Sequence, residues 1–381
     1  MTRSANQPAI ARELVANPMP NAHFVYYELP RWLGAVTRRF HHFHYYLWQF
    51  GALTVARRLH QEVNLDLTHH ATYASFRFPA SVSFLGLPFI WGPIGGAERV
   101  PLAFLRELGP TGAIREIARS VHGRLASLDP FTAYTRRKAT LLLATTPETR
   151  ASLARNSAHV LVFPTIGVEQ IPNGPGAAGR RPDQFRVLTA GNLAPFKGVQ
   201  LALKAFKLLA DAVPSAVFSI VGDGPERPRL EQLAVRLGIS DRVTFLGKLP
   251  RDKVLGLYAA YDVFLYAGLR DSGAMVVLEA MAAAMPVVCL DLGGPGVSVT
   301  SDCGVKVPAS TPEQVVRDLG LALVRLAEDE ALRSRMGEAG LNRVRAQMDW
   351  TRKGEQINAL YESVIAASSM GTGEHGSNTL E

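Results

Sequence analysis

The segment that decides the fold is residues 262–295, DVFLYAGLRDSGAMVVLEAMAAAMPVVCLDLGGP. Short apolar runs at 263–268 and 286–292 lie on either side of a helical pattern that begins near Gly273. This order predicts two parallel strands joined by a helix. Ligands of an open parallel sheet bind beyond the carboxyl ends of its strands, and the first free amides of the next helix attract an anion. The segment therefore predicts an anion site near Gly273.

Two acids, Asp271 and Glu279, bracket the start of this helix. Eight residues of helix span about 12 Å, which is too far for a single proton-transfer centre. The spacing suits an elongated ligand that is held at both ends, with its phosphates over the helix amides. A plain helix cap and a solvated Glu would give the same residues, so the interpretation depends on what the rest of the chain supplies.

The segment Asp271-x7-Glu279, followed by Ala280-Met281 and Pro286-Val287-Val288, resembles the E-x(7)-E segment of retaining glycosyltransferases of the GT-B fold, family 4. The resemblance implies that Glu279 holds the ribose of a nucleotide sugar and that Asp271 contacts the transferred sugar near its reacting carbon. Asp271 is one methylene shorter than the usual Glu, and Ala274 stands where Gly is common. The resemblance also places the helix start in the donor site, with Gly273, Ala274, Met275 and Val276.

Strands and helices alternate through the second half of the chain. We expect strands at 185–190, 217–221, 243–246, 263–266 and 287–290, and helices near 199–213, 225–237, 252–260 and 273–284. Such alternation predicts a doubly wound parallel sheet with right-handed crossovers. The absence of G-x-G-x-x-G argues against a dehydrogenase. With the resemblance, the predicted fold class is α/β, two Rossmann-like domains facing a cleft, with a C-terminal helix that crosses back to the first domain.

The first strand of this half ends in Gly191-Asn192-Leu193-Ala194-Pro195-Phe196-Lys197-Gly198, which resembles the family's G-R-L-x-x-x-K-G turn. A cation is needed there because the leaving diphosphate gains negative charge as the glycosidic bond breaks. Lys197 is expected to meet that charge and, with Asp271, to form the catalytic pair. Asn192 replaces the usual Arg, so one charge and a bidentate donor are lost. Another basic residue substitutes for it, or the donor is held more weakly.

Two further turns complete the expected donor site. Gly222 and Gly224 lie in a G-x-G-P turn that allows a nucleotide to approach the backbone, although any tight turn of this kind would contain them. Leu249 follows the third strand, where the backbone of relatives lies beside the base. The base itself is not predictable from these residues.

The net charge of +8 lies entirely in the first half. Residues 1–175 contain 18 Lys and Arg against 10 Asp and Glu, whereas the rest contains 23 of each. Basic, aromatic domains bind nucleic acid or anionic membranes. No nucleic-acid motif is present, so we expect no nucleic-acid partner. An anionic membrane surface or a lipid-linked acceptor would account for this charge, and so would a basic surface that has no partner. Residues 33–62 could form a membrane-facing helix, although such aromatic residues more often belong to the core.

The acceptor side is expected in the first half. Asp66-Leu67-Thr68-His69 fits a D-x-x-H element of relatives, and His69 and His70 end a short strand at 65–71. A structural role for this histidine is favoured over general-base catalysis. The strand at 88–92 is followed by Gly95, Gly96 and Glu98, whose backbone amides could approach an acceptor or the donor phosphates; a plain loop is the alternative.

The chain opens unusually for this resemblance. No strand with a glycine-rich turn precedes His23, so we expect the first β-α unit to be missing, with a helix at 7–16 and a strand at 23–29 following it. The predicted domains are 1–172 and 183–349, joined by a Gly- and Pro-rich linker at 171–182. A crossover helix is predicted at 350–367 and a disordered tail at 368–381.

Cysteine content and residue spacing bear on the compartment of the protein and on bound metals. Cys289 and Cys303 cannot build a disulfide framework, which favours a reduced, cytoplasmic protein. The basic first half could hold such a protein at the inner face of the membrane. No transmembrane segment or metal-ligand spacing is evident, so no metal and no cofactor are expected.

The predicted function is therefore a glycosyltransferase that moves a hexosyl group from a nucleotide sugar to an acceptor hydroxyl with retention, in polysaccharide or glycolipid synthesis. The acceptor proton could pass to the donor phosphate itself. A glycosidase is disfavoured because its two acids lie about 5–10 Å apart. The alternatives are a non-catalytic nucleotide-sugar-binding protein and a GT-B epimerase; a phosphorylase would need pyridoxal phosphate.

Overall fold

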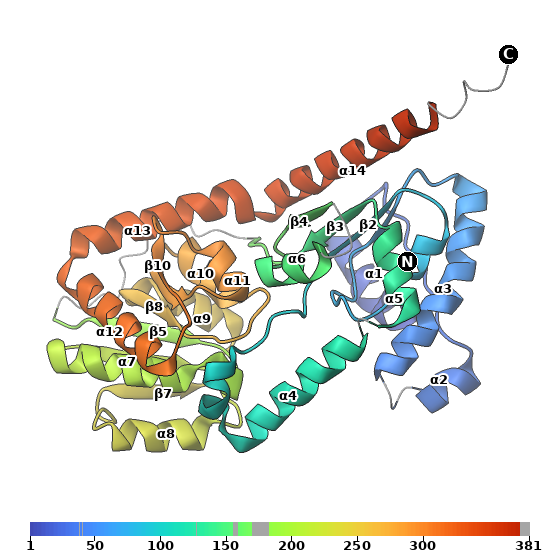
Figure 1. Ribbon diagram of the computed structural model, residues 1–381. Helices are drawn as coiled ribbons and strands as arrows, with labels where there is room; N and C mark the ends of the chain where they lie inside the picture. The colour runs from blue at the N-terminus through green and yellow to red at the C-terminus, as the bar shows by residue number, and fades with distance from the viewer. Residues whose placement is uncertain (38, 40, 127, 155–158, 170–182, 374–381) are drawn as a thin grey trace, which may run out of the picture.

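The protein consists of two parallel sheets, each covered by helices (Figure 1). The computed structural model describes residues 1–37, 39, 41–126, 128–154, 159–169 and 183–373. The predicted linker at 171–182 lies outside the described residues. Two Rossmann-like α/β domains, as the sequence predicted, follow one another along the chain.

The first sheet has four strands in the order β1-β2-β3-β4, all parallel. They are β1 (Thr68–His70), β2 (Phe89–Ile94), β3 (Leu141–Ala144) and β4 (Val160–Val162). The α-helices of this half are α1 (Gln7–Ala16), α2 (Arg31–Thr37), α3 (His41–Val63), α4 (Gly109–Ala126), α5 (Pro130–Lys138) and α6 (Pro147–Ala154). A 3₁₀ helix at Leu102–Leu108 precedes α4.

Two predictions for this half are wrong. The segment 23–29 is not a strand: within it only Tyr26 forms a bridge, parallel to Thr2, and a single bridge is too short a pairing to make a strand. The single helix expected at 33–62 is divided into α2 and α3, and Trp48 of α3 is buried beside Tyr45. The aromatic residues in the middle of α3 therefore belong to the core. The missing first β-α unit stays a prediction.

The second sheet has six parallel strands in the order β10-β9-β8-β5-β6-β7. They are β5 (Arg186–Ala190), β6 (Val217–Val221), β7 (Val243–Gly247), β8 (Val263–Tyr266), β9 (Val287–Leu290) and β10 (Gly304–Val307). The helices are α7 (Val199–Ala212), α8 (Arg227–Arg236), α9 (Arg251–Leu257), α10 (Met275–Ala282), α11 (Gly293–Ser298), α12 (Pro312–Glu328), α13 (Glu330–Arg343) and α14 (Trp350–Gly373). The strand order changes direction between β5 and β8, which places the site at their carboxyl ends.

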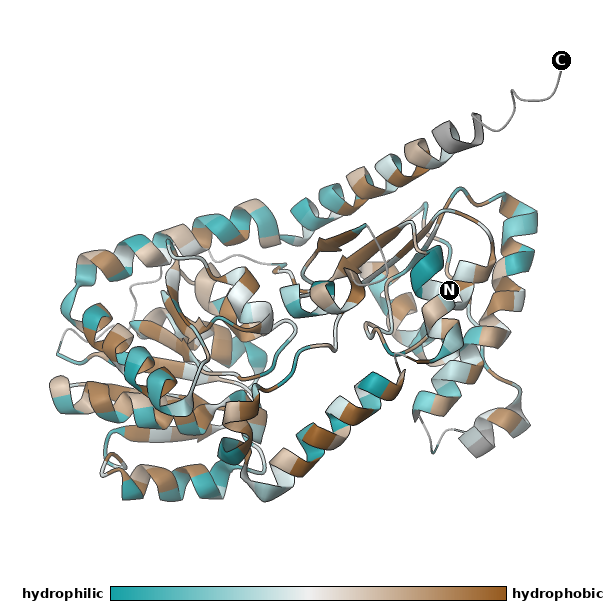
Figure 2. Ribbon diagram, in the orientation of Figure 1, coloured by the Kyte–Doolittle hydropathy of each residue, from teal (hydrophilic) through white to brown (hydrophobic). Residues whose placement is uncertain are grey.

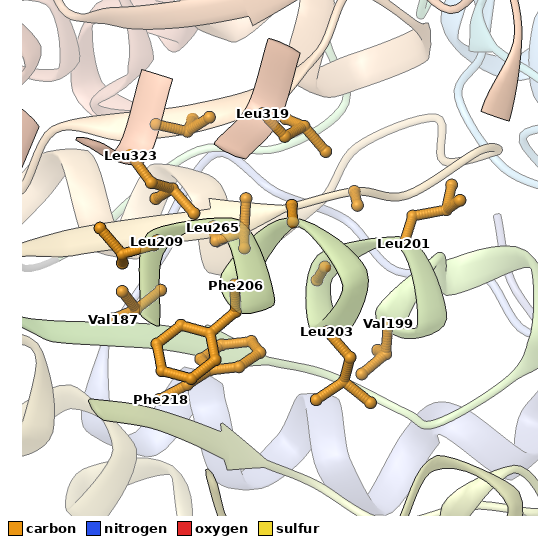
Figure 3. Packing of buried hydrophobic residues seen from close by; sticks show 14 of the residues in the cluster. Val187, Val199, Leu201, Leu203, Phe206, Leu209, Phe218, Leu265, Leu319 and Leu323 are labelled. Atoms are coloured by element: carbon orange, nitrogen blue, oxygen red, sulfur yellow. The ribbon is translucent and has the colours of Figure 1, made fainter. Parts of the chain in front are cut away.

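The largest core lies around α7 (Figure 3). Phe206 of α7 packs against Phe218 of β6, with ring centroids 5.3 Å apart, and Leu319 and Leu323 of α12 belong to the same cluster. Burying such a side chain fully contributes about 1.5–3 kcal/mol. The strands of both sheets are coloured mainly brown in Figure 2, as expected for parallel sheets covered on both faces.

Two segments tie the domains together. Phe104 and Leu108, from the first half of the sequence, are buried in the core around α7. In the other direction, α14 crosses back to the first domain, where Val364 is buried against Ile90 and Leu143. The crossover helix was predicted correctly, but it extends through Gly373, so the expected disorder at 368–373 is wrong; residues 374–381 lie outside the described residues.

Candidate active site

Loops at the carboxyl ends of β5, β6, β8 and β9 pack backbone to backbone around one point. A Cβ at Gly198 would lie 1.8 Å from the Ala267 carbonyl oxygen, and one at Gly222 would lie 1.9 Å from that of Gly191. A Cβ at Gly293 would lie 2.1 Å from the backbone carbonyl oxygen of Asp271. These distances leave no room for a side chain, so glycine is required wherever the loops cross.

Gly198 also has a left-handed backbone, with φ +68°, at the start of α7. We expect Gly198→Ala to lower the free energy of unfolding by more than about 2 kcal/mol, because the new methyl must displace the 267–268 backbone. Chemical denaturation measures the change. Gly256→Ala is the matched control: Gly256 is exposed on α9 with no atom within 4 Å of the added Cβ, so that variant should be stabilised by up to about 1 kcal/mol. Equal stabilities of the two variants would contradict the crowding at Gly198.

The centre of the site is a three-residue cluster of Lys197, Tyr266 and Asp271. Lys197 Nζ lies 2.5 Å from Asp271 Oδ2 and donates a hydrogen bond to the Tyr266 hydroxyl at 3.0 Å. Tyr266 donates to the same Asp271 oxygen at 2.5 Å. A cation from the β5 loop is therefore held next to the acid that follows β8, and both are only slightly exposed.

Burial opposes the charge of Asp271, but Lys197 and the hydrogen bonds outweigh it and hold the pKa of Asp271 below its ordinary value. The same burial, with the neighbouring carboxylate, raises the pKa of Tyr266 well above its ordinary value. At neutral pH the carboxylate is ionised and the phenol keeps its proton. Asp271 is thus a charged, oriented acceptor of hydrogen bonds.

Helix α10 starts two residues later than the predicted Gly273, at Met275. Asp271 Oδ1 accepts hydrogen bonds from the Gly273 and Ala274 amides at 3.1 and 3.0 Å. Ala274 has φ +56°, in the left-handed region that glycine adopts without strain, which fits the glycine expected there from the family resemblance. The next amides, of Met275 and Val276, precede the first helical bond, from the Val277 amide to Ala274.

Glu279 lies on α10, eight residues after Asp271 in the sequence. Its side chain is 8% exposed, and its carboxylate accepts a hydrogen bond from Tyr258 at 3.1 Å. Arg251 of α9 lies 3.2 Å from the other oxygen. Leu249 and Val276 are partly buried in the same apolar cluster as Tyr258. The two acids of the motif therefore have separate sets of partners, as their spacing predicts.

The turn after β5 borders a small hollow of about 10 Å³, lined by Gly191, Asn192, Lys197 and Tyr266 among others. That volume holds about one water molecule. Asn192 is exposed, and its side-chain oxygen lies near Gly224, 2.5 Å from where a Cβ would be. The G-x-G-P turn and the β5 turn are thus in contact.

On the first domain, the predicted glycine loop faces the same region. A Cβ on Gly95 would lie 3.3 Å from Ser272 Cβ, so the loop touches the segment that carries Asp271. Glu98 is buried, and its carboxylate accepts hydrogen bonds from the Gly96 amide, Thr146 and Thr149. Glu98 therefore fixes the shape of the loop from within.

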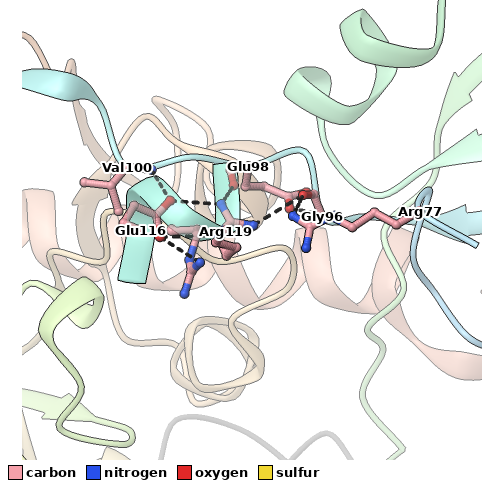
Figure 4. Close-up of polar contacts among 7 residues, drawn as sticks. Arg77, Gly96, Glu98, Val100, Glu116 and Arg119 are labelled. Atoms are coloured by element: carbon pink, nitrogen blue, oxygen red, sulfur yellow. Dashed lines mark hydrogen bonds and ion pairs between the residues drawn. The ribbon is translucent and has the colours of Figure 1, made fainter. Parts of the chain in front are cut away.

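A cluster of arginines that the sequence reasoning missed surrounds this loop (Figure 4). Arg77 and Arg119 donate to the Gly96 carbonyl oxygen, and Arg119 also pairs with Glu116 at 3.0 Å. Arg270, adjacent to Asp271, pairs with the same Glu116 at 2.9 Å and lies over the Phe196 ring. Burial and the other guanidinium groups lower the pKa values of Arg77 and Arg270.

A cavity of about 600 Å³ lies between the domains beside this cluster. Both domains line it, with the start of α4 on one side and the 194–196 and 225–229 segments on the other. Its walls include Arg115, Arg119, Arg229 and Arg270. Only a weak sequence signal could have indicated these residues. Arg270 directly precedes the motif acid, but Arg115 and Arg119 of α4 reach the cavity only through the tertiary structure.

His69 and His70 are not part of this constellation. They line a separate cavity of about 550 Å³ in the first domain, with Tyr45 and Trp48. His69 lies between the Tyr361 hydroxyl, at 2.7 Å, and the Gly92 carbonyl oxygen, at 2.5 Å. His70 contacts the Tyr45 hydroxyl at 3.0 Å. The contact with Tyr361 of α14 gives His69 a position-holding role.

Burial, aided by His69, lowers the pKa of His70 to about 4. Because unfolded histidine has a pKa of about 6.5, the unfolded state binds more protons between these values. We expect the free energy of unfolding to fall as pH drops from about 6.5 to 4, by at most about 3 kcal/mol from this residue. Denaturation at several pH values measures the slope. His70→Gln should flatten this slope, and an unaltered slope in His70→Gln would contradict the assignment.

The described residues include no group of three or more His, Cys, Asp or Glu side chains placed to hold a metal ion. In the same part of the chain, no helix is both long and apolar enough to cross a bilayer.

Known proteins resemble this chain in both sequence and fold. Residues 173–343 match the family model of glycosyl transferases group 1. The D-inositol 3-phosphate glycosyltransferase of Corynebacterium glutamicum strain R is 30% identical over 198 residues, covering 50% of this chain and 46% of that protein. A GDP-mannose-dependent monoacylated alpha-(1-6)-phosphatidylinositol monomannoside mannosyltransferase of C. glutamicum ATCC 13032 is 32% identical over 178 residues, 45% of each chain. The chain spans about half the length of the curated relatives it matches.

Solved structures match over more of the chain. Anabaena HepE in complex with UDP and glucose has a TM-score of 0.60 at 16% identity, covering 93% of this chain and 89% of that one. Sucrose-phosphate synthase of Thermosynechococcus elongatus has a TM-score of 0.56 at 19% identity, covering 91% and 82%. At such identities the likeness concerns the fold, and the fold is GT-B, two Rossmann-like domains, as predicted.

Proposed function

We propose that the protein is a retaining hexosyltransferase of family 4 that uses a nucleoside-diphosphate sugar. The observation that carries the proposal is the Lys197-Asp271 pair at the start of α10. It lies within the segment that matches glycosyl transferases group 1, and the curated relatives in that comparison are named as glycosyltransferases. A cation, an oriented acid and helix amides are what the departure of a sugar diphosphate requires.

In the proposed reaction, the bond between the anomeric carbon and the diphosphate oxygen breaks, and a bond to the acceptor hydroxyl forms on the same face. Lys197 and the Met275 and Val276 amides stabilise the negative charge that develops on the diphosphate. Asp271 orients the sugar, and Glu279 holds the ribose. The acceptor proton passes to the departing phosphate. With these groups in place, neither a metal nor a cofactor enters the proposed mechanism.

The acceptor is proposed to be a saccharide or a lipid-linked molecule, in polysaccharide or glycolipid synthesis. Relatives support this class, because their names include inositol 3-phosphate and a phosphatidylinositol monomannoside. Gly95 touches Ser272, and this contact supports the proposal that the 95–96 loop forms the acceptor side of the reacting centre. We propose a cytoplasmic enzyme that works at the inner face of the membrane, without nucleic acid; its two cysteines are free and buried.

The test is incubation of the protein with UDP-, GDP- and ADP-sugars. A transferase should bind one nucleoside diphosphate in calorimetry and hydrolyse the matching sugar slowly in the absence of acceptor. Release of the free sugar in its original anomeric form, followed by NMR, would support retention. Binding without release would favour the non-catalytic alternative, and neither binding nor release would overturn the proposal.

A further inference from the structure

Helix α4 has its apolar side in solvent. Ile114, Ile117, Val121 and Leu125 are 66, 51, 47 and 61% exposed, and Leu128, just beyond the helix, is 76% exposed. Their spacing of three and four residues aligns them on one face, which we call the α4 stripe. A surface helix of a globular protein normally turns such a face to the core. In α4 the apolar face is exposed to solvent instead.

The opposite face of α4 is polar or small and is buried. Glu116 is 5% exposed, and Gly123 is also buried, against Arg77. Glu116 accepts hydrogen bonds from the Val100 amide and from Arg270, and Arg119 donates to Gly96. These contacts fix the rotation of the helix, so the α4 stripe cannot turn inward without breaking the arginine cluster.

Further apolar side chains extend the surface beyond α4. His122 of α4 stacks on His42 at 6.4 Å, which brings the start of α3 beside the end of α4. Phe43 of α3 is 54% exposed and Phe131 of α5 is 41% exposed. Figure 2 shows brown residues interspersed with teal ones along α4, which runs beneath the two sheets in that view.

The charges around the stripe are of one sign. Residues 99–138 contain eight Arg and Lys against three Asp and Glu. Each of the three acids has a partner within the protein: Glu107 pairs with Lys204, Glu116 with Arg270, and Asp129 caps α5. Arg115 and Arg124 of α4 are exposed, as are Arg137 and Lys138 of α5. The surface that borders the α4 stripe is therefore basic.

We propose that the α4 stripe docks on an anionic lipid bilayer, with α4 lying in the plane of the interface. An apolar face flanked by Arg and Lys is the pattern of helices that bind at such interfaces. An isolated apolar patch of this kind marks an interaction site, and its uniform basic border fits negatively charged headgroups.

The position of α4 gives the docking a consequence for the reaction. The buried face of α4 contacts Gly96 and Arg270, while its exposed face would meet lipid. A helix is about 10–12 Å in diameter, so the bilayer surface would lie about that far from the cavity between the domains. This step rests on the proposed function: a lipid-linked acceptor would enter the cavity past α4.

The test is co-sedimentation with vesicles of phosphatidylcholine containing about one third phosphatidylglycerol, roughly the anionic character of a cytoplasmic leaflet. We expect the protein to bind them, and Ile117→Asp with Leu125→Asp to weaken binding at least about tenfold. Arg115→Glu with Arg124→Glu should also weaken binding, and vesicles of phosphatidylcholine alone should bind less. The matched control is Val235→Asp with Leu321→Asp, at apolar residues 65 and 61% exposed on α8 and α12, which should bind as the unmodified protein does.

Absence of binding to the anionic vesicles, or equal binding by the stripe variant, would overturn the proposal. So would a dimer in light scattering that the stripe variant makes monomeric without any vesicle binding, because the stripe would then join two copies of the chain. Nucleoside diphosphate affinity, measured on the same proteins, separates this question from the proposed function. A protein that binds nucleotide but not vesicles would contradict only the membrane docking of α4. A protein that binds vesicles but no nucleotide would contradict only the proposed donor site.

Discussion

Lys197→Ala is expected to lower the kcat/KM for sugar transfer about 100- to 1,000-fold, which is the usual effect of removing one preorganised charge donor. The ammonium lies 2.5 Å from Asp271, at the end of β5 where the departing diphosphate is proposed to rest. Its loss leaves the developing charge to the helix amides alone. Asp271 keeps Tyr266 and the Gly273 and Ala274 amides as partners, so the fold should remain.

Steady-state kinetics with the donor identified in the binding experiments measures the effect, and denaturation confirms that the variant is folded. Lys207→Ala is the matched control. Lys207 lies on α7 in the same domain, and among the described residues it pairs only with Asp211. The control should retain full activity. A Lys197→Ala enzyme with unchanged kcat/KM would show that the diphosphate is neutralised elsewhere.

Glu279→Ala is expected to weaken nucleoside diphosphate binding at least about 100-fold and to leave the fold intact. Hydrogen bonds to a charged group contribute about 1.5–3 kcal/mol each, and a carboxylate that holds two ribose hydroxyls makes two of them. Removing the carboxylate leaves few buried polar groups without a partner. Arg251 is already 70% exposed, and only the Tyr258 hydroxyl loses a buried partner.

Calorimetry with the diphosphate, and with the corresponding free base, measures this role. The deficit should appear for the nucleotide and not for the base, because the base is expected to lie near Leu249 rather than at Glu279. Glu231→Ala, at an exposed α8 carboxylate paired with Arg227, is the control and should bind normally. Undiminished affinity in Glu279→Ala would mean that the ribose lies elsewhere.

Much of the second domain was predictable because its strands are continuous apolar runs. The segment around β8, α10 and β9 was placed within one or two residues at every strand boundary. Two elements were missed. Strand β10 is four residues long and includes Lys306, so it resembles a loop. Helix α11 begins with two glycines, and there tertiary packing overrides propensity: a Cβ on Gly294 would lie 2.7 Å from the Gly273 backbone.

The candidate site was predictable where it depends on short motifs. Lys197 and Asp271 were singled out from separate turns, and the structure joins them. Their partners were not predicted: Tyr266 and Tyr258 are typical core residues, and the direction of a hydroxyl depends on strand register and on neighbouring helices. The arginine cluster was missed because Glu116, Arg119 and Arg270 meet only when α4 lies across the domain boundary.

The first domain was predicted less well for a related reason. His69 and His70 line a different cavity from the hollow beside Lys197, and their acceptor-side role stays a prediction. For the segment that forms α3, the sequence left a core helix and a membrane-facing helix open, and its aromatic residues are mostly covered, as the core alternative expects. The exposed apolar face belongs to α4, whose periodicity looks like that of any core helix until its buried side is known.

The most direct test of this account is a crystal structure with whichever of UDP, GDP and ADP binds most tightly. We predict that the diphosphate lies at the start of α10, with oxygens within hydrogen-bond distance of Lys197 Nζ and of the Met275 and Val276 amides, and with the ribose hydroxyls on Glu279. A diphosphate bound elsewhere, with Lys197 still engaged only by Asp271 and Tyr266, would contradict it.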